Sequence, residues 1–225
     1  MCSRYSLTSP PEAVRAYFAY PETPNFPARY NIAPTQPVAV VCLDAAGKRS
    51  FRLMRWGLLP PFVKDPKRFP TLINARAEGV LTKLAFRAAL ARRRCLIPAD
   101  GFYEWTGSKS RRPFLLRARK RGLIAFAGIW ECWRDREGGE IDTVAILTCA
   151  AHATVTPLHD RMPVVLPADA FEAWLDCAGT EAEAALALLQ PTPDDLLEAI
   201  EIDPKINDSR HDEPDIQQPL QPSLL

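Results

Sequence analysis

Residues 95–105, which read Cys-Leu-Ile-Pro-Ala-Asp-Gly-Phe-Tyr-Glu-Trp, begin the part of the chain that decides its fold. From there onward, short β-prone runs alternate with turns rich in Gly, Ser, Lys and Arg, a pattern typical of antiparallel strands. The strands predicted in this way are 95–98, 102–105, 114–117, 123–127 and 144–149. The sequence therefore predicts an α+β fold whose sheet is largely antiparallel and partly closed, a pseudo-barrel with peripheral helices.

The segments around this sheet add a hairpin and the helices. Runs 38–43 and 50–56 are β-prone and flank a polar loop, which predicts a hairpin. Ser9-Pro10-Pro11-Glu12 has the form of a capping box with proline at the first helical position, which predicts a helix start. The predicted helices cover about 10–19, 80–93, 169–175 and 180–189, and Asp194 and Asp195 resemble a further cap ahead of Leu196 and Leu197.

Nothing in the chain suggests a division into two domains. A chain of 225 residues with 47% hydrophobic content can bury a sizeable core as one domain. After His211 the composition turns to Pro, Gln and Asp, which is typical of a mobile segment outside the core. We therefore expect one domain over residues 1–212 and a mobile C-terminal tail over residues 213–225.

The composition indicates where in the cell the protein is expected, but it does not indicate which class of molecule the protein binds. No run of 18 apolar residues occurs and no apolar stretch follows Arg4, which argues against a membrane span or a secretory signal. A cytoplasmic protein is expected, associated with the nucleoid when it is bound to DNA. The formal net charge of +1 indicates no particular partner, but 21 of the 28 basic residues are arginine, which suits bidentate phosphate contacts.

The cysteines and histidines form no recognisable metal motif. No two cysteines stand at a C-x-x-C spacing, and His152 and His159 are too far apart in sequence for a helical i, i+4 pair. We therefore predict no metal and no cofactor. The four cysteines beside apolar strand residues are expected to be reduced, buried thiols: Cys42, Cys95, Cys132 and Cys149.

Cys2 is unusual for its position. If Met1 is removed, one residue carries both an α-amine and a thiol. The amine has a pKa of about 7.7–8.0 against about 10.4 for lysine, so a larger share of it is neutral and nucleophilic at pH 7. It can form an imine with an aldehyde, and the thiol can then close a five-membered thiazolidine ring. The alternative is an incidental residue on a frayed terminus.

Several polar and aromatic strings stand out beyond the hydrophobic pattern. They are Tyr30-Asn31-Ile32-Ala33-Pro34-Thr35, Arg55-Trp56-Gly57-Leu58-Leu59-Pro60-Pro61, Ile73-Asn74-Ala75-Arg76-Ala77-Glu78, Asp100-Gly101-Phe102-Tyr103-Glu104-Trp105 and Pro157-Leu158-His159-Asp160-Arg161-Met162-Pro163. With Cys2, and in this order, they make the chain resemble the SOS response-associated peptidase (SRAP) family, also described as abasic-site-processing proteins. The likeness runs from Cys2 to about Glu213. It implies an SRAP-type single domain that recognises abasic sites in single-stranded DNA and crosslinks to them through Cys2, which protects the site.

The resemblance implies roles for four catalytic residues. Cys2 matches the nucleophile, and Asn74 matches a residue that orients the nucleophile and the sugar. Glu104 matches a carboxylate that assists ring opening, and its aromatic neighbours should raise its pKa by desolvation. His159 matches the site histidine, whose ordinary pKa near 6.5 suits proton transfer. The alternatives are an Asn that bonds loop backbone, a strand Glu that faces solvent and a His paired with Asp160.

DNA contacts are expected beside these residues. Arg4, Arg76 and Arg161 each stand within two residues of a proposed catalytic group, where guanidinium groups would bind flanking phosphates. The further contacts are expected from Pro34 and Trp105, as flat surfaces, from Thr148, which matches a polar contact, and from Phe62. The alternatives are solvated surface charges for the arginines and a core aromatic for Trp105.

Two departures from the family pattern concern how DNA lies on the protein. Ser3 follows the nucleophile where most members have glycine, so the backbone approach to DNA there can differ. Phe62-Val63 stands where an aromatic pair is usual. Because only Phe62 remains to wedge against a stacked base, a weaker preference for strand-to-duplex junctions is expected, while the capture chemistry should survive.

Other functions stay open from the sequence alone. Cys2 could serve an N-terminal-nucleophile peptidase that removes its own leading methionine with Asn74 and His159. A non-covalent single-strand binding module would need no Cys2 chemistry. A glutamine amidotransferase lacks support because no cysteine-glycine start is present. For the favoured function the partner is single-stranded DNA with abasic sites, the protein is expected to be a monomer, and β-elimination from the imine would be a related lyase activity.

Overall fold

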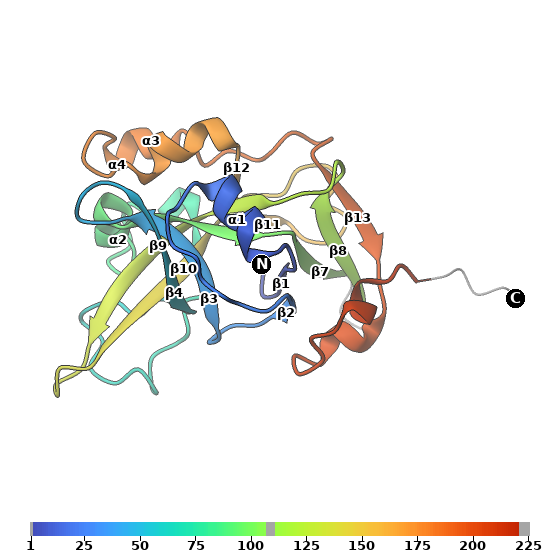
Figure 1. The fold of residues 1–225 in the computed structure, drawn as a ribbon, viewed down its shortest axis with the longest axis horizontal. Helices are drawn as coiled ribbons and strands as arrows, with labels where there is room; N and C mark the ends of the chain where they lie inside the picture. Colours follow the sequence, from blue (N-terminus) through green and yellow to red (C-terminus); the bar gives the residue numbers. More distant parts are fainter. Residues whose placement is uncertain (1, 107–110, 221–225) are drawn as a thin grey trace, which may run out of the picture.

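Five strands close into a barrel in the computed structural model, which describes residues 2–106 and 111–220. In Figure 1 the barrel strands β3, β4, β9 and β10 lie on the opposite side of the molecule from β8 and β13. Around the barrel, β10 pairs with β4, β4 with β3, β3 with β6, β6 with β9, and β9 again with β10. All of these pairings are antiparallel except β4 with β10, which is parallel. The strands are β3 (Pro37–Leu43), β4 (Arg49–Trp56), β6 (Arg94–Ala99), β9 (Ile124–Arg134) and β10 (Glu140–Ala150).

A second, antiparallel sheet continues directly from the barrel. Only Asp100 separates β6 from β7, so the chain passes from one sheet to the other without a loop. The strand order in this sheet is β13-β8-β7-β1-β2. Its strands are β1 (Tyr5–Leu7), β2 (Arg29–Ile32), β7 (Gly101–Thr106), β8 (Arg112–Ala118) and β13 (Leu197–Glu201).

Three short strands pair with the long barrel strands β9 and β10. β5 (Asn74–Arg76) and β11 (Arg161–Pro163) pair with the last residues of β10, and β12 (Val165–Leu166) pairs with β9. Thr148 faces Arg76 on one side of β10, and Ala150 faces Arg161 on the other. The end of β10 is therefore flanked by two segments that carry candidate site residues.

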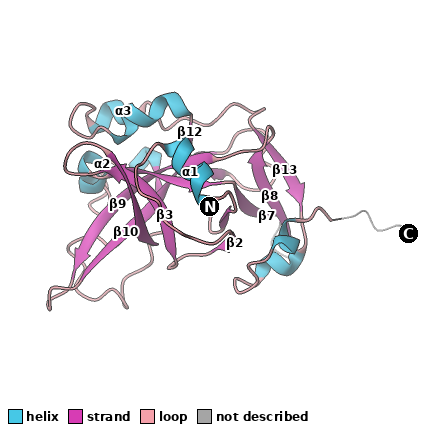
Figure 2. Cartoon of the chain, in the orientation of Figure 1, coloured by secondary structure: helices cyan, strands magenta, loops and turns pink. Residues whose placement is uncertain are grey.

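The helices are short and lie outside the sheets (Figure 2). The hydrophobic face of α1 buries Val14 and Phe18, and Phe18 stacks on Phe171 of α3 with ring centroids 5.6 Å apart. No helix among residues 2–106 and 111–220 is long and apolar enough to cross a membrane. The helices are α1 (Pro11–Phe18), α2 (Arg87–Arg92), α3 (Phe171–Leu175) and α4 (Ala182–Leu186), with 3₁₀ turns η1 (Ala77–Gly79), η2 (Ala168–Ala170), η3 (Pro204–Asn207) and η4 (Pro214–Gln217).

Aromatic packing joins the two sheets into one core. Tyr5, from β1 of the second sheet, meets Trp56 of the barrel edge-to-face at 5.3 Å between ring centroids. It meets Phe126 of β9 in the same way at 5.7 Å. All three side chains are fully buried, and such pairs stabilise beyond the area they bury by about 0.5–1.5 kcal/mol each.

A buried arginine fixes α3 to the barrel. The guanidinium of Arg94, at the start of β6, donates to the carbonyl oxygens of Trp174 (2.6 Å), Asp176 (2.7 Å) and Thr180 (2.7 Å). These carbonyls lie at and beyond the end of the helix, where backbone acceptors lack intrahelical partners. Since Arg94 is only 1% exposed, its hydrogen bonds compensate the desolvation of its charge.

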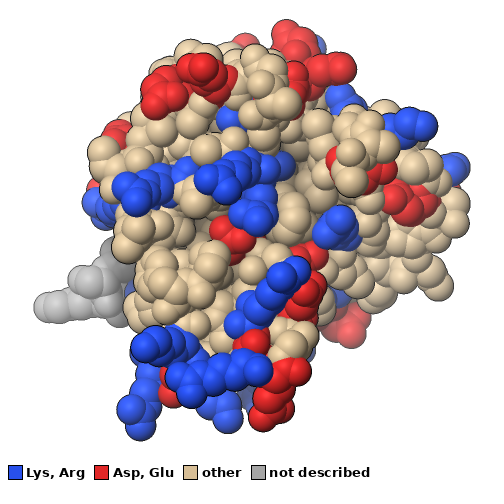
Figure 3. Space-filling model, turned by 90° about the vertical axis from the view of Figure 1, so that its left-hand side faces the viewer, with Lys and Arg blue, Asp and Glu red and all other residues tan. Residues whose placement is uncertain are grey.

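Charge is unevenly distributed over the surface despite the formal net charge of +1. On the face drawn in Figure 3, Lys and Arg side chains gather in groups, and Asp and Glu side chains lie between and beside them. The near balance in total charge thus combines local patches of opposite sign. Such patches, and not the total, set the field that an approaching polyanion meets.

The main predictions of the fold are confirmed. The protein is an α+β domain with a largely antiparallel, closed sheet, and the predicted hairpin is β3–β4. The helix predicted over about 10–19 is α1, but Ser9 does not cap it: its hydroxyl donates to Asp100, and Pro10 is the N-cap. The predicted strands after Cys95 are β6 to β10, of which β9 and β10 are longer than predicted.

Two helix predictions are wrong. Only residues 87–92 of the helix predicted over 80–93 are helical, because Thr82 bonds the carbonyl of Gly79 and the chain turns there. Leu84 is consequently 62% exposed. The cap predicted before Leu196 and Leu197 begins no helix, because residues 197–201 pair with β8 at five successive positions as strand β13.

Part of the C-terminal segment that the composition predicts to be mobile packs against the rest of the protein. Residues 214–217 form η4, and Ile216 is completely buried beside Tyr103, Leu115 and Ile202. Gln217 also donates a 2.7 Å hydrogen bond to the Tyr103 hydroxyl. Residues 213–220, which were expected outside the core, therefore cover the second sheet; the rest of the predicted tail lies outside the described residues.

Replacing Ile216 with alanine should lower the free energy of unfolding by about 2–4 kcal/mol, since it empties a buried apolar site. Urea unfolding measures this value. Leu220→Ala is the matched control because Leu220 is 44% exposed, and it should change stability by less than about 0.5 kcal/mol. Equal effects of the two substitutions would contradict the packing of η4.

Candidate functional site

Cys2 is a buried and ordered residue. Its side chain is 0% exposed, and its thiol donates a 3.6 Å hydrogen bond to the carbonyl oxygen of Arg4. The same carbonyl accepts the backbone N–H of Tyr103 at 3.0 Å, which ties this end of the chain to β7. The alternative of a frayed terminus therefore does not describe Cys2.

Asn74 holds Cys2 from the barrel side. Its Nδ2 donates a 2.8 Å hydrogen bond to the Cys2 carbonyl oxygen. Asn74 begins β5, whose parallel pairing with β10 places it opposite Ile146. Its Oδ1 is buried and has no hydrogen-bond partner within residues 2–106 and 111–220, so this acceptor is available to a bound group.

Glu104 places a carboxyl group with a raised pKa beside Cys2. It lies on β7 and is 4% exposed. Burial raises the pKa of Glu104 to about 7, and the negative charge of Asp160 acts in the same direction. The pKa of the Cys2 thiol is raised well above its ordinary value, first by burial and then by the charge of Glu104. Glu104 can therefore exchange a proton near neutral pH, whereas the resting thiol stays protonated.

His159 lies in the loop before β11. Its Nδ1 lies 2.9 Å from the backbone nitrogen of Arg161 and 2.7 Å from Oδ1 of Asp160. The neutral ring can accept the Arg161 N–H, and the protonated ring can donate to Asp160, so each charge state has a partner. Burial lowers the pKa of His159, which favours the neutral ring at pH 7.

Thr148, Arg76 and Arg161 lie together at the end of β10. Arg161 donates to the carbonyl oxygen of the buried Thr148 at 2.6 Å and to both carboxylate oxygens of Glu78 at 2.6 and 2.9 Å. Arg76 is exposed on β5, directly opposite Thr148 in the register. One guanidinium is thus largely enclosed and paired, and the other faces solvent.

The remaining predicted contacts have other neighbours. Arg4 donates to Oδ1 of Asn31 at 2.9 Å and to the carbonyl oxygen of Ile206 at 3.1 Å, so its guanidinium supports the fold. Trp105 donates to Oδ1 of Asn207 at 2.7 Å. Phe62 is 51% exposed and meets Phe69 edge-to-face, and Pro34 is half-buried after β2.

No group of three or more metal-ligating side chains comes together in the part of the chain that the structure describes. All six cysteines are unpaired thiols, and Cys42, Cys95 and Cys149 are buried as predicted. The prediction is wrong for Cys132, which is partly exposed and whose thiol lies 3.7 Å from Oε2 of Glu140.

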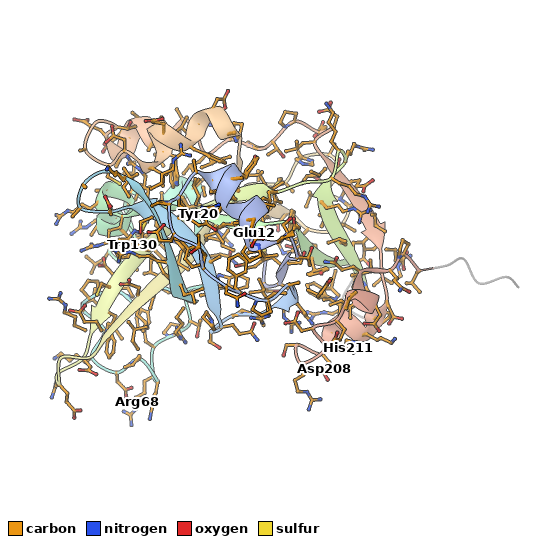
Figure 4. The ribbon with its side chains drawn as sticks, in the orientation of Figure 1. Glu12, Tyr20, Arg68, Trp130, Asp208 and His211 are labelled. Carbon is orange, nitrogen blue, oxygen red and sulfur yellow. The ribbon has the colours of Figure 1, made fainter. Side chains whose placement is uncertain are left out.

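Sequence reasoning missed two polar residues that shape the site. Asn31 is fully buried, and its Nδ2 donates to the carbonyl oxygens of Ile206, Asp208 and His211. Asp208 and His211 lie in the C-terminal segment that this amide holds (Figure 4). Glu78, the partner of Arg161, was also missed. Asn31 and Glu78 both lie in sequence strings quoted above. The available signal was that each is a polar residue of such a string to which no role had been assigned.

The comparisons with known proteins identify the family of the chain. A family model described as "SOS response associated peptidase (SRAP)" matches residues 1–209, which is most of the chain. The chain belongs to the SRAP family. This SRAP domain is 36% identical over 222 residues to the abasic site processing protein YoqW of Bacillus subtilis, covering 96% of this chain and 98% of that one. It is 30% identical to the abasic site processing protein HMCES of Rattus norvegicus, covering 74% of this chain and 56% of that protein.

Solved structures share the fold of the SRAP domain. A crystal structure of a Bacteroides thetaiotaomicron protein aligns with a TM-score of 0.86 at 21% identity, covering 97% of this chain and all of that one. A Bordetella bronchiseptica protein aligns with a TM-score of 0.78 at 29% identity, covering 90% of this chain and all of that one.

The raised pKa of Glu104 should appear as a pH-dependent loss of stability. In the unfolded chain the carboxyl group titrates near its ordinary 4.5, whereas the folded protein holds the proton up to about pH 7. The stabilisation by this proton is complete below pH 4.5 and is lost between pH 4.5 and 7. The free energy of unfolding should therefore fall by roughly 3 kcal/mol relative to Glu104→Gln over this interval and stay level above it. A difference between the two proteins that does not vary with pH in chemical denaturation would contradict the raised pKa.

Proposed function

We propose that this SRAP domain captures the aldehyde of abasic sites in single-stranded DNA as a covalent adduct with Cys2. The observation that carries the proposal is the 2.8 Å hydrogen bond from Asn74 to the Cys2 carbonyl, which fixes the residue within electrostatic range of Glu104. The name of the relatives, abasic site processing protein, points to the same substrate. The reactive form begins at Cys2, with Met1 removed.

The order of the two bond-forming steps follows from the charge states. Burial and the charge of Glu104 keep the thiol protonated, so it is a poor first nucleophile. The α-amine, with an ordinary pKa of about 7.7–8.0, attacks the aldehyde carbon first. The carbonyl oxygen leaves as water with the two amine protons, and an imine remains. The sulfur then adds to the imine carbon while the thiol proton passes to the imine nitrogen, which closes a thiazolidine.

Glu104 and His159 would move protons in these steps. The aldehyde forms when the closed sugar opens, which requires a proton to be taken from the sugar hydroxyl and one to be given to the ring oxygen. A carboxyl group with a pKa of about 7 can do either near neutral pH. His159, neutral at pH 7 and partnered in both charge states, is suited to relay the proton when water leaves.

Asn74, Arg76 and Arg161 would position the strand. The Nδ2 of Asn74 donates to the carbonyl oxygen of Cys2. Its Oδ1 is a buried acceptor without a hydrogen-bond partner in the described residues, which suits a sugar hydroxyl. Arg76 and Arg161 flank the end of β10 and would bind the phosphates beside the lesion. Because no base is present at the lesion, recognition depends on the aldehyde and the backbone and not on sequence.

The contacts of three other residues refine the expected DNA interface. Arg4 and Trp105 are bonded to the C-terminal segment, so we propose that they shape the wall of the site more than they bind phosphate. Phe62 is exposed on the loop after β4 and remains a candidate for stacking on a base.

The wild-type protein should form a heat-stable adduct with a single-stranded oligonucleotide that contains an abasic site. Mass spectrometry should give the mass of the protein from Cys2 onward plus DNA minus one water. Cys2→Ala keeps an α-amine but cannot close the ring, so its adduct should survive heat only after borohydride reduction. A heat-stable adduct of unreduced Cys2→Ala would overturn the thiazolidine, and no wild-type adduct at all would overturn the function.

Glu104→Gln should slow adduct formation by about 10²- to 10⁴-fold, the usual contribution of general acid–base catalysis. The wild-type rate should show the titration of Glu104 near pH 7 in addition to that of the α-amine at about pH 7.7–8.0, and only the titration of the α-amine should remain in the variant. Asn74→Ala should slow the reaction by about tenfold to a hundredfold, through loss of one positioning hydrogen bond, and keep the pH dependence. Single-turnover rates from pH 5 to 9 measure both. A pH profile that is identical in Glu104→Gln and wild type would contradict the role of Glu104.

A further inference from the structure

The ion pair between Arg161 and Glu78 places an acidic group on the solvent side of an enclosed arginine. Both carboxylate oxygens are bonded, Oε1 to Nη1 at 2.6 Å and Oε2 to Nη2 at 2.9 Å. The Arg161 side chain is 12% exposed, whereas that of Glu78 is 58% exposed. The carboxylate can therefore leave the pair into water without disturbing the core.

Arg161 has contacts that would hold it in place without Glu78. Its Nη2 donates to the carbonyl oxygen of Thr148 at 2.6 Å and lies 3.5 Å from the hydroxyl of the same residue. Thr148 is completely buried on β10, so this anchor is rigid. The Nε of Arg161 is buried and has no hydrogen-bond partner within the described ranges, so the guanidinium keeps a spare donor.

Two arginines act electrostatically on Glu78, and each lies on one of the strands that flank the end of β10. β5 with Arg76 and β11 with Arg161 flank β10 on opposite sides, which separates the two strands by roughly 10 Å. The pKa of Glu78 is lowered by its hydrogen bond to Arg161 and by the charges of Arg161 and Arg76. The carboxylate thus stays charged and interacts favourably with both guanidinium groups, most strongly with that of Arg161.

We propose that Glu78 is a displaceable stand-in for a backbone phosphate of single-stranded DNA. A carboxylate and a phosphate present the same pair of oxygens to the guanidinium fork, so one can replace the other without moving Arg161. The exchange makes Glu78 a specificity-determining residue. A single free anion meets a site that is already filled, whereas a strand that also contacts Arg76 displaces the carboxylate. This inference rests on the proposed function, since it assumes that DNA runs along this edge.

Binding of an undamaged single-stranded oligonucleotide by the Cys2→Ala protein tests the inference apart from the covalent chemistry. In this background Glu78→Gln keeps the size of the side chain and removes its charge. Affinity, measured by fluorescence anisotropy, should rise by about three- to tenfold, the effect of removing one competing surface ion pair. In the parent protein, the displaced Glu78 carboxylate takes up a cation from solution when DNA binds, which reduces the net release of cations. Glu78→Gln lacks this carboxylate, so the slope of log Kd against log salt should steepen by about 0.7.

Two further variants separate competition from general charge and from folding. Glu12→Gln removes the same charge from an exposed site on α1 and should change affinity by less than about twofold. Glu78→Asp keeps the charge but shortens the reach to Arg161, so its affinity should fall between those of the parent and Glu78→Gln. Thermal unfolding of each variant shows whether the fold is intact.

The possible contrary results are distinct. If Glu78→Gln binds like Glu12→Gln with an unchanged salt slope, Glu78 does not compete with phosphate and the inference is overturned. Weaker binding by Glu78→Gln would also overturn it, since the acid would then support Arg161 instead of occupying its ligand position. If the parent and every variant fail to bind DNA, the proposed function itself fails.

Discussion

Strand β10 is hydrogen-bonded along both edges, and the site depends on this pairing. Its first residues close the barrel against β9 and β4, and its last residues hold β5 and β11. Backbone polar groups in an interior must be paired, so the register of these short strands is set by β10 and not by their own side chains. A slip of one residue in β5 would turn Asn74 to the opposite face and release the Cys2 carbonyl. The geometry around Cys2 is thus a property of the sheet.

A second constraint joins the beginning of the chain to its C-terminal segment. Asn31 lies between them, accepting from Arg4 and donating to three carbonyl oxygens of residues 206–211. Asp212 completes the joint through a 2.7 Å hydrogen bond from the backbone nitrogen of Asn31. Because this amide is buried, each of its bonds matters more than it would in water. The segment that follows Cys2 is held in place by Ile206, which is 202 residues away from Arg4 in the sequence.

The parts of the fold that the sequence predicts are those with a strong local pattern. The hairpin 38–56 and the strands after Cys95 are β-prone runs bounded by turn residues, and α1 has a proline start. The failures are elements decided by distant partners. β13 exists because β8 offers an open edge, and β5 and β11 are three residues each, too short for any periodicity. Ile216 is one apolar residue in a polar segment, which no composition rule marks as core.

The site likewise has features that the sequence predicts and features that depend on distant partners. Resemblance points to Cys2, Asn74, Glu104 and His159, and the described contacts connect the first three through a hydrogen bond and electrostatic coupling. Local spacing indicated arginines beside them, but it did not distinguish an exposed Arg76 from an Arg161 already paired with Glu78. Such a difference depends on the three-dimensional partner of each charge, which a linear pattern does not contain.

The burial of Cys2 has a consequence for how its reactivity is measured. Alkylating reagents and peroxide react with exposed thiolates, and this thiol is both covered and protonated. Cys132 and Cys177, which are partly exposed, will be modified before it. A protein whose two surface thiols have been titrated can therefore keep the Cys2 thiol unmodified. The same shielding would preserve Cys2 under oxidative conditions, in which DNA bases are themselves damaged and lost.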